Sequence, residues 1–316
     1  MPIDSHRPVI HLTESFSYSE EALQIYRARG KISFEAELGA GEHDRVVALV
    51  VRLQTRIDEK FLARFPKLKY VVSPTTGLNH VDLEACRRRR IQVISLKGEA
   101  AFLKSITSTS ELAFGLILAL VKKIPASCSS VLKGVWKRDR FLSRQLSRMS
   151  LGIIGYGRLG RNMEAYGKAF GMRVRVYDKS YARGGRSRNA VDLRELLRES
   201  DVVSLHIDYS PENESFMNGA RFKQMKSGCF FVNTARGELV DDAALLHALQ
   251  SGRIAGAAVD VLRDEQSENL LKENVLIRYA KTHPGLIVTP HIGGTSLDAR
   301  HMTEVFVAQK FARKFK

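Results

Sequence analysis

Three side chains in the second half of the sequence have types suited to carbonyl and acid–base chemistry. Arg236 follows an apolar run and a turn of small residues in NTARGELVD, where its planar guanidinium could bind a carboxylate and polarise an adjacent carbonyl. Glu265 in AAVDVLRDEQ and His291 in TPHIGG form a natural pair, because a carboxylate beside an imidazole fixes its tautomer and favours proton transfer near neutral pH. Taken singly, Arg236 also fits a surface arginine, and His291 a structural or surface histidine.

A glycine-rich segment, LGIIGYGRLGRNMEAYGKAFGMRVRVYD, lies upstream of these side chains and reads as strand, turn, helix and strand. Gly155 would allow the tight turn, Gly157 would let the backbone approach a pyrophosphate, and Gly160 would let the helix pack closely on its strand. Asp178 ends the second strand, where a carboxylate can accept hydrogen bonds from a ribose diol. The segment predicts a dinucleotide site, with a purely structural glycine turn as the alternative.

The elements that must position these groups alternate along the chain. Short apolar runs separated by amphipathic stretches in the first hundred residues predict a small α/β domain. A long apolar helix beginning near Ser108 leads into the glycine segment, and Pro125 marks its bend or end. The expected strands are residues 8–12, 46–52, 70–73, 92–96, 173–177, 201–207, 229–233, 255–261 and 286–289, and the other expected helices are 20–29, 58–65, 242–251 and 297–316.

This alternation predicts a parallel, doubly wound sheet with its ligand at the carboxyl ends of the strands. NTARGELVD, AAVDVLRDEQ and TPHIGG each stand at such an end. In this order, after LGIIGYGRLG, the three motifs resemble the D-isomer-specific 2-hydroxyacid dehydrogenase family. The resemblance runs from TTGLNHVDL through SELAFGLILAL to TPHIGG and covers nearly the whole chain.

The resemblance implies a Rossmann-type dinucleotide-binding domain at residues 104–292. It also implies a smaller, flavodoxin-like α/β substrate domain made of residues 1–103 and 293–316, with a cleft between the two domains. By resemblance, Arg236, Glu265 and His291 are catalytic in hydride transfer between NAD(H) and a small D-2-hydroxy acid or 2-oxo acid. Arg236 also binds substrate, together with a loop at Thr75, Thr76 and Gly77. An ordinary turn is the alternative for Gly77.

The family's cofactor contacts carry over in the same way. NAD is favoured over NADP because Asp178 would repel a 2′-phosphate, whereas Lys179, Arg183 and Arg186 soften that preference. Arg52, at a strand end, could assist an anionic substrate, with a surface arginine as the alternative. The implied cofactor-binding residues are Gly155, Gly157, Arg158, Leu159, Gly160, Asp178, His206, Asp208, Ser215, Thr234, Ala235 and Asp260.

The chain departs from the family pattern at four positions, none of which removes a proton-transfer group. Asp208 stands where the family has proline in the loop that crosses the cofactor, and Ser215 stands for threonine. Gln266 replaces proline after the catalytic glutamate, and Leu112 replaces a frequent histidine. A carboxylate at Asp208 could alter the relative affinity for the two redox forms of the cofactor, but we expect it to point outward.

Composition limits the remaining possibilities. With 316 residues, 44% of them apolar and 27% charged, the chain fits a two-domain globular protein. The net charge of +16 raises nucleic-acid binding as a function, but its densest runs (residues 87–90, 183–188 and 310–316) lack the interleaved aromatic residues of a single-strand binder. We therefore expect a solvated basic surface and no nucleic-acid partner.

Three widely spaced cysteines, Cys86, Cys128 and Cys229, predict neither disulfides nor a metal site and suit a reducing, cytoplasmic setting. We expect no membrane span, since no apolar stretch approaches the ~20 residues that a membrane helix needs. The family resemblance implies a homodimer. The alternative to an enzyme is an NAD-responsive binding or corepressor-like scaffold protein.

Overall fold

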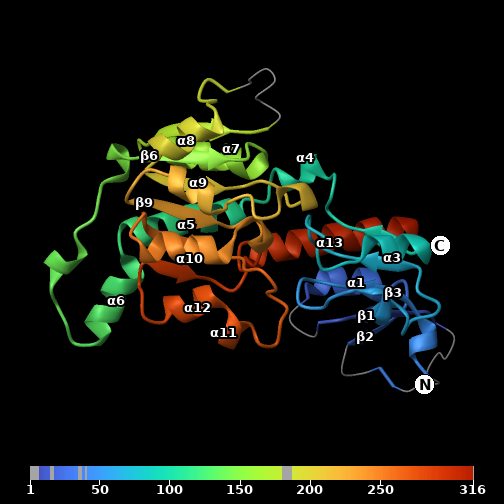
Figure 1. The fold of residues 1–316 in the computed structure, drawn as a ribbon. Coiled ribbons are helices and arrows are strands. Elements are labelled where there is room, and N and C mark those ends of the chain that lie inside the picture. The colour runs from blue at the N-terminus through green and yellow to red at the C-terminus, as the bar shows by residue number, and fades with distance from the viewer. Residues whose placement is uncertain (1–6, 15–17, 35–37, 40, 180–186, 316) are drawn as a thin grey trace. The chain divides into compact units, whose positions relative to one another are not determined.

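The computed structural model describes residues 7–14, 18–34, 38–39, 41–179 and 187–315 (Figure 1). The chain divides into two compact units. The smaller unit comprises Met1–Ile106 and Ser296–Lys316, and the larger unit comprises Thr107–Thr295. The smaller unit is therefore built from two pieces of chain that are far apart in the sequence.

The smaller unit contains a five-stranded parallel sheet in the order β2-β1-β3-β4-β5, which is the flavodoxin-like order. Its edge strand β2 was not expected from the sequence. The strands are β1 (Val9–Leu12), β2 (Lys31–Phe34), β3 (Val46–Val50), β4 (Tyr70–Val72) and β5 (Gln92–Ile94).

Helices cover both faces of this sheet. On one face, α1 (Glu20–Arg27) packs beside α13 (Leu297–Lys314), and the rings of Tyr26 and Phe311 meet with centroids 5.6 Å apart. On the other face lie α2 (Glu59–Leu62) and α3 (Leu83–Arg88), whose apolar side chains share a core with β3 and β4. The short helix α4 (Ala100–Leu103) ends the first piece of this unit.

The larger unit contains a six-stranded parallel sheet in the order β11-β10-β9-β8-β6-β7. Ala190 adds an isolated parallel bridge to Val176 at the outer side of β7. The chain proceeds from β6 toward β7 and then returns to β8, so β6 marks the point where the strand order reverses, as in Rossmann-type folds. The strands are β6 (Ser150–Ile154), β7 (Arg173–Tyr177), β8 (Val202–Leu205), β9 (Cys229–Asn233), β10 (Ile254–Val259) and β11 (Leu286–Val288).

This sheet is also covered on both faces. One face carries α5 (Ser108–Val121) and α7 (Arg158–Ala169). The opposite face carries α8 (Leu193–Glu199), α9 (Gly219–Gln224), α10 (Asp242–Gln250) and α12 (Val275–Ala280), with the short α11 (Leu270–Glu273) preceding α12. The chain between α5 and β6, including α6 (Ile124–Leu132), loops away from the sheet (Figure 1).

We expected no apolar stretch as long as a membrane helix, but the segment Ala100–Val121 reaches that length. By length and composition alone it could cross a membrane, with a mean hydropathy of 1.3. Its helical part α5 packs on the larger sheet, where Ala113, Ile117 and Leu120 are buried. The same apolar residues therefore serve as a core helix of this unit. Pro125 stands in the first turn of α6, where a missing N–H is tolerated, so it marks a helix start that follows the end of α5.

A buried carboxylate fastens the amino ends of β6 and β8. Asp201, 2% exposed, accepts hydrogen bonds from the backbone N–H of Ser150 at 2.8 Å, from Arg144 at 2.8 Å and from Lys226 at 2.8 Å. Burial opposes ionisation, but these hydrogen bonds outweigh it and hold the pKa of Asp201 well below its usual range. Because the opposite end of β6 carries the glycine turn, this anchor supports the candidate site.

We expect Asp201→Asn to destabilise the protein by about 2 kcal/mol at pH 7, because it removes a buried charge that three donors stabilise. A carboxyl with a lowered folded-state pKa contributes stability above its unfolded pKa of ~3.9 and loses it as the pH falls further. The difference in melting temperature between wild type and variant should therefore shrink below about pH 4. Asp139→Asn, at a side chain 87% exposed, is the control. An equal difference at neutral and acidic pH would contradict this assignment.

Candidate active site

The glycine turn at the end of β6 requires close backbone approach. Gly155 has φ of +95°, and a Cβ there would lie 2.5 Å from the His206 carbonyl oxygen at the end of β8. A Cβ at Gly160 would lie 2.1 Å from the Gly155 carbonyl oxygen. Both glycines are therefore demanded by packing within the protein itself.

Gly157 differs from these two glycines. A Cβ there would meet no atom within 4 Å, so nothing described in the protein requires a glycine. It is the N-cap of α7 and supplies no side chain to the first helical N–H groups, while Arg158, Leu159 and Gly160 form the first turn. A helix start of this kind suits an anionic group such as a pyrophosphate, and a glycine here leaves room for it.

Asp178 lies just beyond β7, beside the glycine turn. Its Oδ2 accepts the backbone N–H of Tyr156 at 2.8 Å, which ties the end of β7 to the turn after β6. Lys179 is exposed, whereas Arg183 and Arg186 lie outside the described residues. The predicted ribose acid therefore stands next to the predicted pyrophosphate turn.

Two buried polar atoms at neighbouring strand ends lack a partner within the described structure. His206 Nδ1 follows β8, and Thr234 Oγ1 follows β9. His206 donates or accepts through Nε2 with Ser204 Oγ at 2.8 Å, and burial lowers its pKa to about 4, so it is neutral near pH 7. Buried polar groups normally have partners, so these two atoms fit a polar ligand such as a dinucleotide.

The loop after β8 carries two more of the expected cofactor residues, Asp208 and Ser215. Asp208 is exposed, in agreement with the outward orientation expected for it. Ser215 has φ of +49°, and its N–H donates to the Glu238 carbonyl oxygen at 2.8 Å. This loop is therefore bonded to the turn after β9.

Arg236 is presented by a turn built from its neighbours. The Asn233 side chain accepts the N–H of Ala235 at 3.0 Å and donates to the Arg236 carbonyl oxygen at 2.9 Å. The Arg236 guanidinium, half-buried, donates to the Ala235 carbonyl oxygen at 2.7 Å. A Cβ at Gly237 would lie 2.0 Å from the Leu262 carbonyl carbon, so the turn packs directly on the chain after β10. Asn233 and Gly237 were not singled out from the sequence, although both stand inside the NTARG motif.

Glu265 and His291 form the pair expected from their types. His291 Nδ1 lies 2.6 Å from Glu265 Oε1, and the two side chains are 21% and 30% exposed. This bond leaves Nε2 as the ring nitrogen available to a ligand. The His291 backbone has φ of +53°, which is uncommon for a residue with a side chain.

Asp260 holds the turn that carries His291. Its carboxylate accepts hydrogen bonds from Thr289 Oγ1 at 2.6 Å and from the N–H groups of Ile292 at 2.9 Å and Gly293 at 2.8 Å. Its carbonyl oxygen accepts the His291 N–H at 2.8 Å. Burial raises the pKa of this carboxyl, and the three donors oppose that effect. The family resemblance implies a cofactor contact for Asp260, and the structure adds hydrogen bonds by which Asp260 positions the His291 turn.

The three chemical side chains stand at the ends of three neighbouring strands. Arg236 follows β9, Glu265 follows β10 and His291 follows β11, and these strands are adjacent in the order β9-β10-β11. Parallel strands end at one edge of a sheet, so all three share the edge that carries the glycine turn. The set combines a cation for a carboxylate or carbonyl with a carboxylate–imidazole pair for proton transfer.

The predicted substrate loop lies after β4 in the smaller unit. Thr75 Oγ1 contacts Ser73 Oγ at 2.8 Å and donates to the Gly77 carbonyl oxygen at 2.8 Å, while Thr76 is exposed. Ser73 also lies 3.4 Å from His80 Nε2, a buried contact that the sequence did not reveal. These bonds give the loop a defined shape.

Arg52, the sequence-based candidate for anion binding, is engaged within the smaller unit. It forms an ion pair with Glu304 of α13, and its guanidinium lies 3.8 Å from the centroid of the Tyr18 ring. The side chain is only 15% exposed and is paired with Glu304. Both interpretations from the sequence, an arginine that binds an anionic substrate and a surface arginine, therefore fit it poorly.

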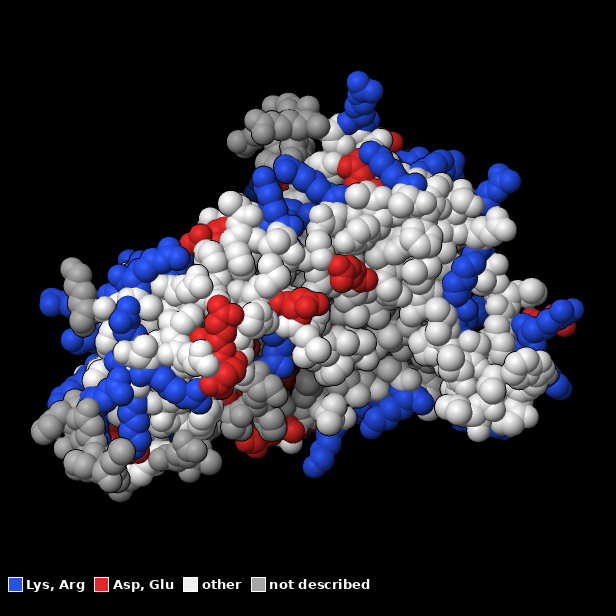
Figure 2. All heavy atoms as spheres, turned by 180° about the vertical axis from the view of Figure 1, so that it is seen from behind, with Lys and Arg blue, Asp and Glu red and all other residues white. Residues whose placement is uncertain are grey.

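On the face that Figure 2 shows, Lys and Arg side chains gather in several groups, and uncharged surface separates these groups. In the run at residues 87–90, Arg87 pairs with Glu84 at 2.5 Å, and Arg88 and Arg89 pair with Glu59 at 2.9 and 3.1 Å. These arginines therefore have partners within the chain itself.

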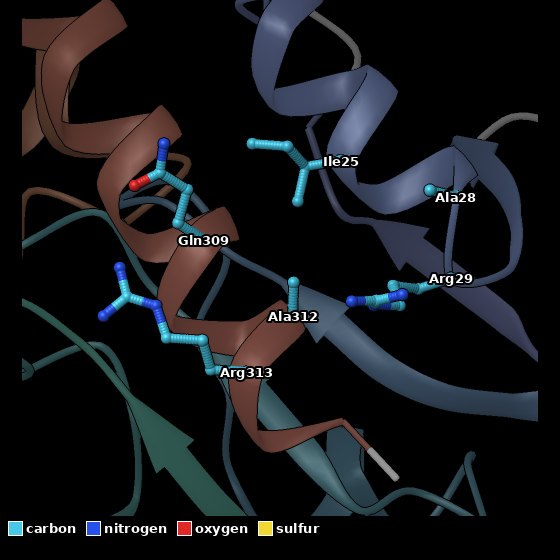
Figure 3. A pocket seen from close by; sticks show the side chains of 6 residues that line it. All are labelled: Ile25, Ala28, Arg29, Gln309, Ala312 and Arg313. Carbon is cyan, nitrogen blue, oxygen red and sulfur yellow. The ribbon is translucent and has the colours of Figure 1, made fainter.

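A groove of about 420 Å³ in the smaller unit lies apart from these residues (Figure 3). It runs between α1 and α13. Its lining consists of Ile25, Ala28, Arg29, Gln309, Ala312 and Arg313, none of which belongs to the predicted site.

Known proteins share this organisation. Two family models match the chain: the catalytic domain of D-isomer specific 2-hydroxyacid dehydrogenases over residues 12–192, and the NAD binding domain of the same family over residues 114–293. A D-3-phosphoglycerate dehydrogenase of Haemophilus influenzae is 35% identical over 264 residues, which are 83% of this chain and 62% of that relative. The chain thus spans less than two thirds of that relative's length.

Other relatives are matched over more of their length. A glyoxylate reductase of Thermococcus litoralis is 33% identical over 277 residues, covering 84% of this chain and 79% of that enzyme. The solved structure of D-lactate dehydrogenase from Aquifex aeolicus, complexed with NAD and lactic acid, superposes with a TM-score of 0.81 at 28% identity, covering 97% and 96% of the two chains. These findings confirm the resemblance drawn from the motifs: the chain belongs to the D-isomer-specific 2-hydroxyacid dehydrogenase family, and residues 114–293 match its NAD-binding domain.

Proposed function

We propose that this protein is an NAD-dependent oxidoreductase that transfers a hydride between NAD(H) and a small D-2-hydroxy acid or its 2-oxo acid. The observation that carries the proposal is the 2.6 Å contact between His291 Nδ1 and Glu265 Oε1, at the sheet edge that also bears Arg236 and the glycine turn. When bound, the nicotinamide supplies or accepts the hydride.

In this proposal His291 moves the proton. Glu265 holds Nδ1, so Nε2 is the atom that donates a proton to the carbonyl oxygen during reduction and takes it back during oxidation. Glu265 also keeps the His291 ring in the orientation that presents Nε2 to the substrate. Arg236 binds the substrate carboxylate and stabilises negative charge developing on the carbonyl oxygen. The Thr75–Gly77 loop of the smaller unit is the proposed second contact to the carboxylate.

The larger unit is the proposed cofactor domain. Gly157 and the start of α7 take the pyrophosphate, Asp178 takes the adenosine ribose, and His206 and Thr234 supply the unpartnered polar atoms on the nicotinamide side. Asp178 favours NAD over NADP, since a carboxylate repels a 2′-phosphate. The smaller unit is the proposed substrate domain. Three free thiols, with Cys86 and Cys229 buried, support a reducing, cytoplasmic setting.

We further propose that the protein is a homodimer associating through α6 and the chain that follows it. Leu132, Trp136 and Leu142 are 88%, 86% and 75% exposed, and such a concentration of large apolar side chains typically marks an interface. The apolar helix α5 places most of its apolar side chains inside its own unit, so it offers little apolar surface to a second copy of the chain.

Removal of the proposed catalytic groups tests the reaction. Arg236→Ala and His291→Ala should each lower kcat/KM by about a hundredfold or more on the acid that wild type reduces fastest, because each removes a group needed in the transition state. The dissociation constant for NADH should stay within about twofold. The measurement is turnover on a panel of 2-oxo acids with NADH and with NADPH. Arg278→Ala and His247→Ala, at exposed positions on α12 and α10, are matched controls.

The results distinguish an enzyme from a scaffold protein, and NAD from NADP as the cofactor. Wild type that binds NADH but reduces no acid would favour a scaffold role, and a preference for NADPH would overturn the assignment of Asp178.

Gly157→Ala should raise the dissociation constant for NADH about tenfold or more with little change in melting temperature, because the added methyl meets no protein atom but occupies the proposed pyrophosphate position. NADH fluorescence titration and thermal unfolding measure the two effects. Gly115→Ala, where a Cβ also meets nothing within 4 Å, is the control and should bind NADH normally. Normal binding by Gly157→Ala would argue against this cofactor position.

The double variant Leu132→Glu/Trp136→Glu should convert a dimer into a monomer, because it places charges in the proposed apolar interface. Light scattering coupled to size-exclusion chromatography should give twice the 35.5 kDa chain mass for wild type and the single mass for the variant. Leu271→Glu, at a residue 69% exposed on α11, should remain dimeric. A monomeric wild type would refute the proposal.

A further inference from the structure

Arg263 stands inside the AAVDVLRDEQ motif, but neither the sequence analysis nor the proposed reaction gives it a role. It lies in the chain after β10, two residues before Glu265. Its guanidinium pairs with Glu214 Oε1 at 2.6 Å, donates to Ser215 Oγ at 3.2 Å and donates to the Glu238 carbonyl oxygen at 3.1 Å. Strands β8, β9 and β10 are neighbours in the sheet. From the loop after β10, the Arg263 guanidinium thus contacts both the loop after β8 and the loop after β9.

The segments that Arg263 joins are those of the candidate site. Ser215 belongs to the loop proposed to cross the cofactor, and Glu238 lies two residues after Arg236. The Glu238 carbonyl oxygen also accepts the N–H of Ser215 at 2.8 Å, so Arg263 adds a second donor to an acceptor already shared between two loops.

The backbone at these segments is strained. Five described residues other than glycine have positive φ, and three of them lie here: Ser215 at +49°, Asp264 at +53° and His291 at +53°. Such conformations are unfavourable for residues with side chains and persist where the surroundings determine them. Arg263 contributes to these surroundings at two of the three residues: it donates a hydrogen bond to Ser215, and it immediately precedes Asp264 in the chain.

We propose that Arg263 is a positioning residue for cofactor binding: it fastens the Glu214–Ser215 segment to the turns that carry Arg236 and Glu265. This inference rests on the proposed function. Its removal lets the cofactor-side loop relax, while the Glu265–His291 pair and the Asp260 contacts remain. The cost therefore falls on the affinity for the cofactor and spares the chemical step.

The test compares Arg263→Met with wild type by NADH titration and steady-state kinetics. We expect the dissociation constant and KM for NADH to rise about tenfold, as for the loss of a charge-assisted hydrogen-bond set, with kcat within about threefold of wild type. Arg263→Lys keeps the ion pair with Glu214 but lacks the fork that reaches both Ser215 and Glu238, so it should regain melting temperature more than NADH affinity. Arg198→Met, on the exposed side of α8, removes one positive charge elsewhere and should bind NADH as wild type does.

Each result bears on the proposal. An NADH dissociation constant within about twofold of wild type in both Arg263 variants overturns it, whatever the melting temperatures. A loss confined to kcat also overturns it. If Arg263→Met does not fold, the lysine variant alone decides. Wild type that fails to bind NADH, or binds it without reducing any acid, marks failure of the proposed function instead.

Discussion

The structure depends on one constraint: parallel strands all end at the same edge of their sheet. In the larger unit this places the loops after β6, β8, β9, β10 and β11 side by side, although they are spread over more than a hundred residues of sequence. Gly155 packs against the His206 carbonyl, and Gly237 packs against Leu262, so neighbouring loops touch through their backbones. The glycine turn and the polar trio are therefore parts of one rigid edge rather than separate motifs.

That edge is held by polar contacts between loops. Asp260 fixes the turn of His291 with three donors, and Asn233 shapes the turn of Arg236. Two of these loops carry residues with positive φ, Ser215 and His291. The stability of the sheet, anchored at its opposite edge by Asp201, offsets the strain that the loops retain.

Much of this arrangement could be read from the sequence, because glycine spacing and apolar periodicity are local signals. The strand ends carrying Arg236, Glu265 and His291 follow from such signals. Contacts between distant loops do not: Arg263 meets Glu214 across 49 positions, and no local pattern marks that pair. The edge strand β2 is four residues long, too short for its alternation to be decisive. By composition, the apolar run Ala100–Val121 fits either a membrane-spanning helix or a buried core helix. Only the packing of α5 on the larger sheet shows that it is a core helix.

The split composition of the smaller unit has a consequence for biosynthesis. Its helix α13 comes from the last described residues, yet it forms half of the layer over that sheet: Phe311 packs on Tyr26, and Glu304 accepts the Ser19 N–H at 2.7 Å. On the ribosome, the amino-terminal piece emerges first but lacks this partner, whereas the larger unit is continuous and can fold as soon as it is made. The amino-terminal piece thus completes its fold only after α13 is made, and the apolar face of α1, with Ala22, Leu23 and Tyr26, is the surface that must be protected meanwhile.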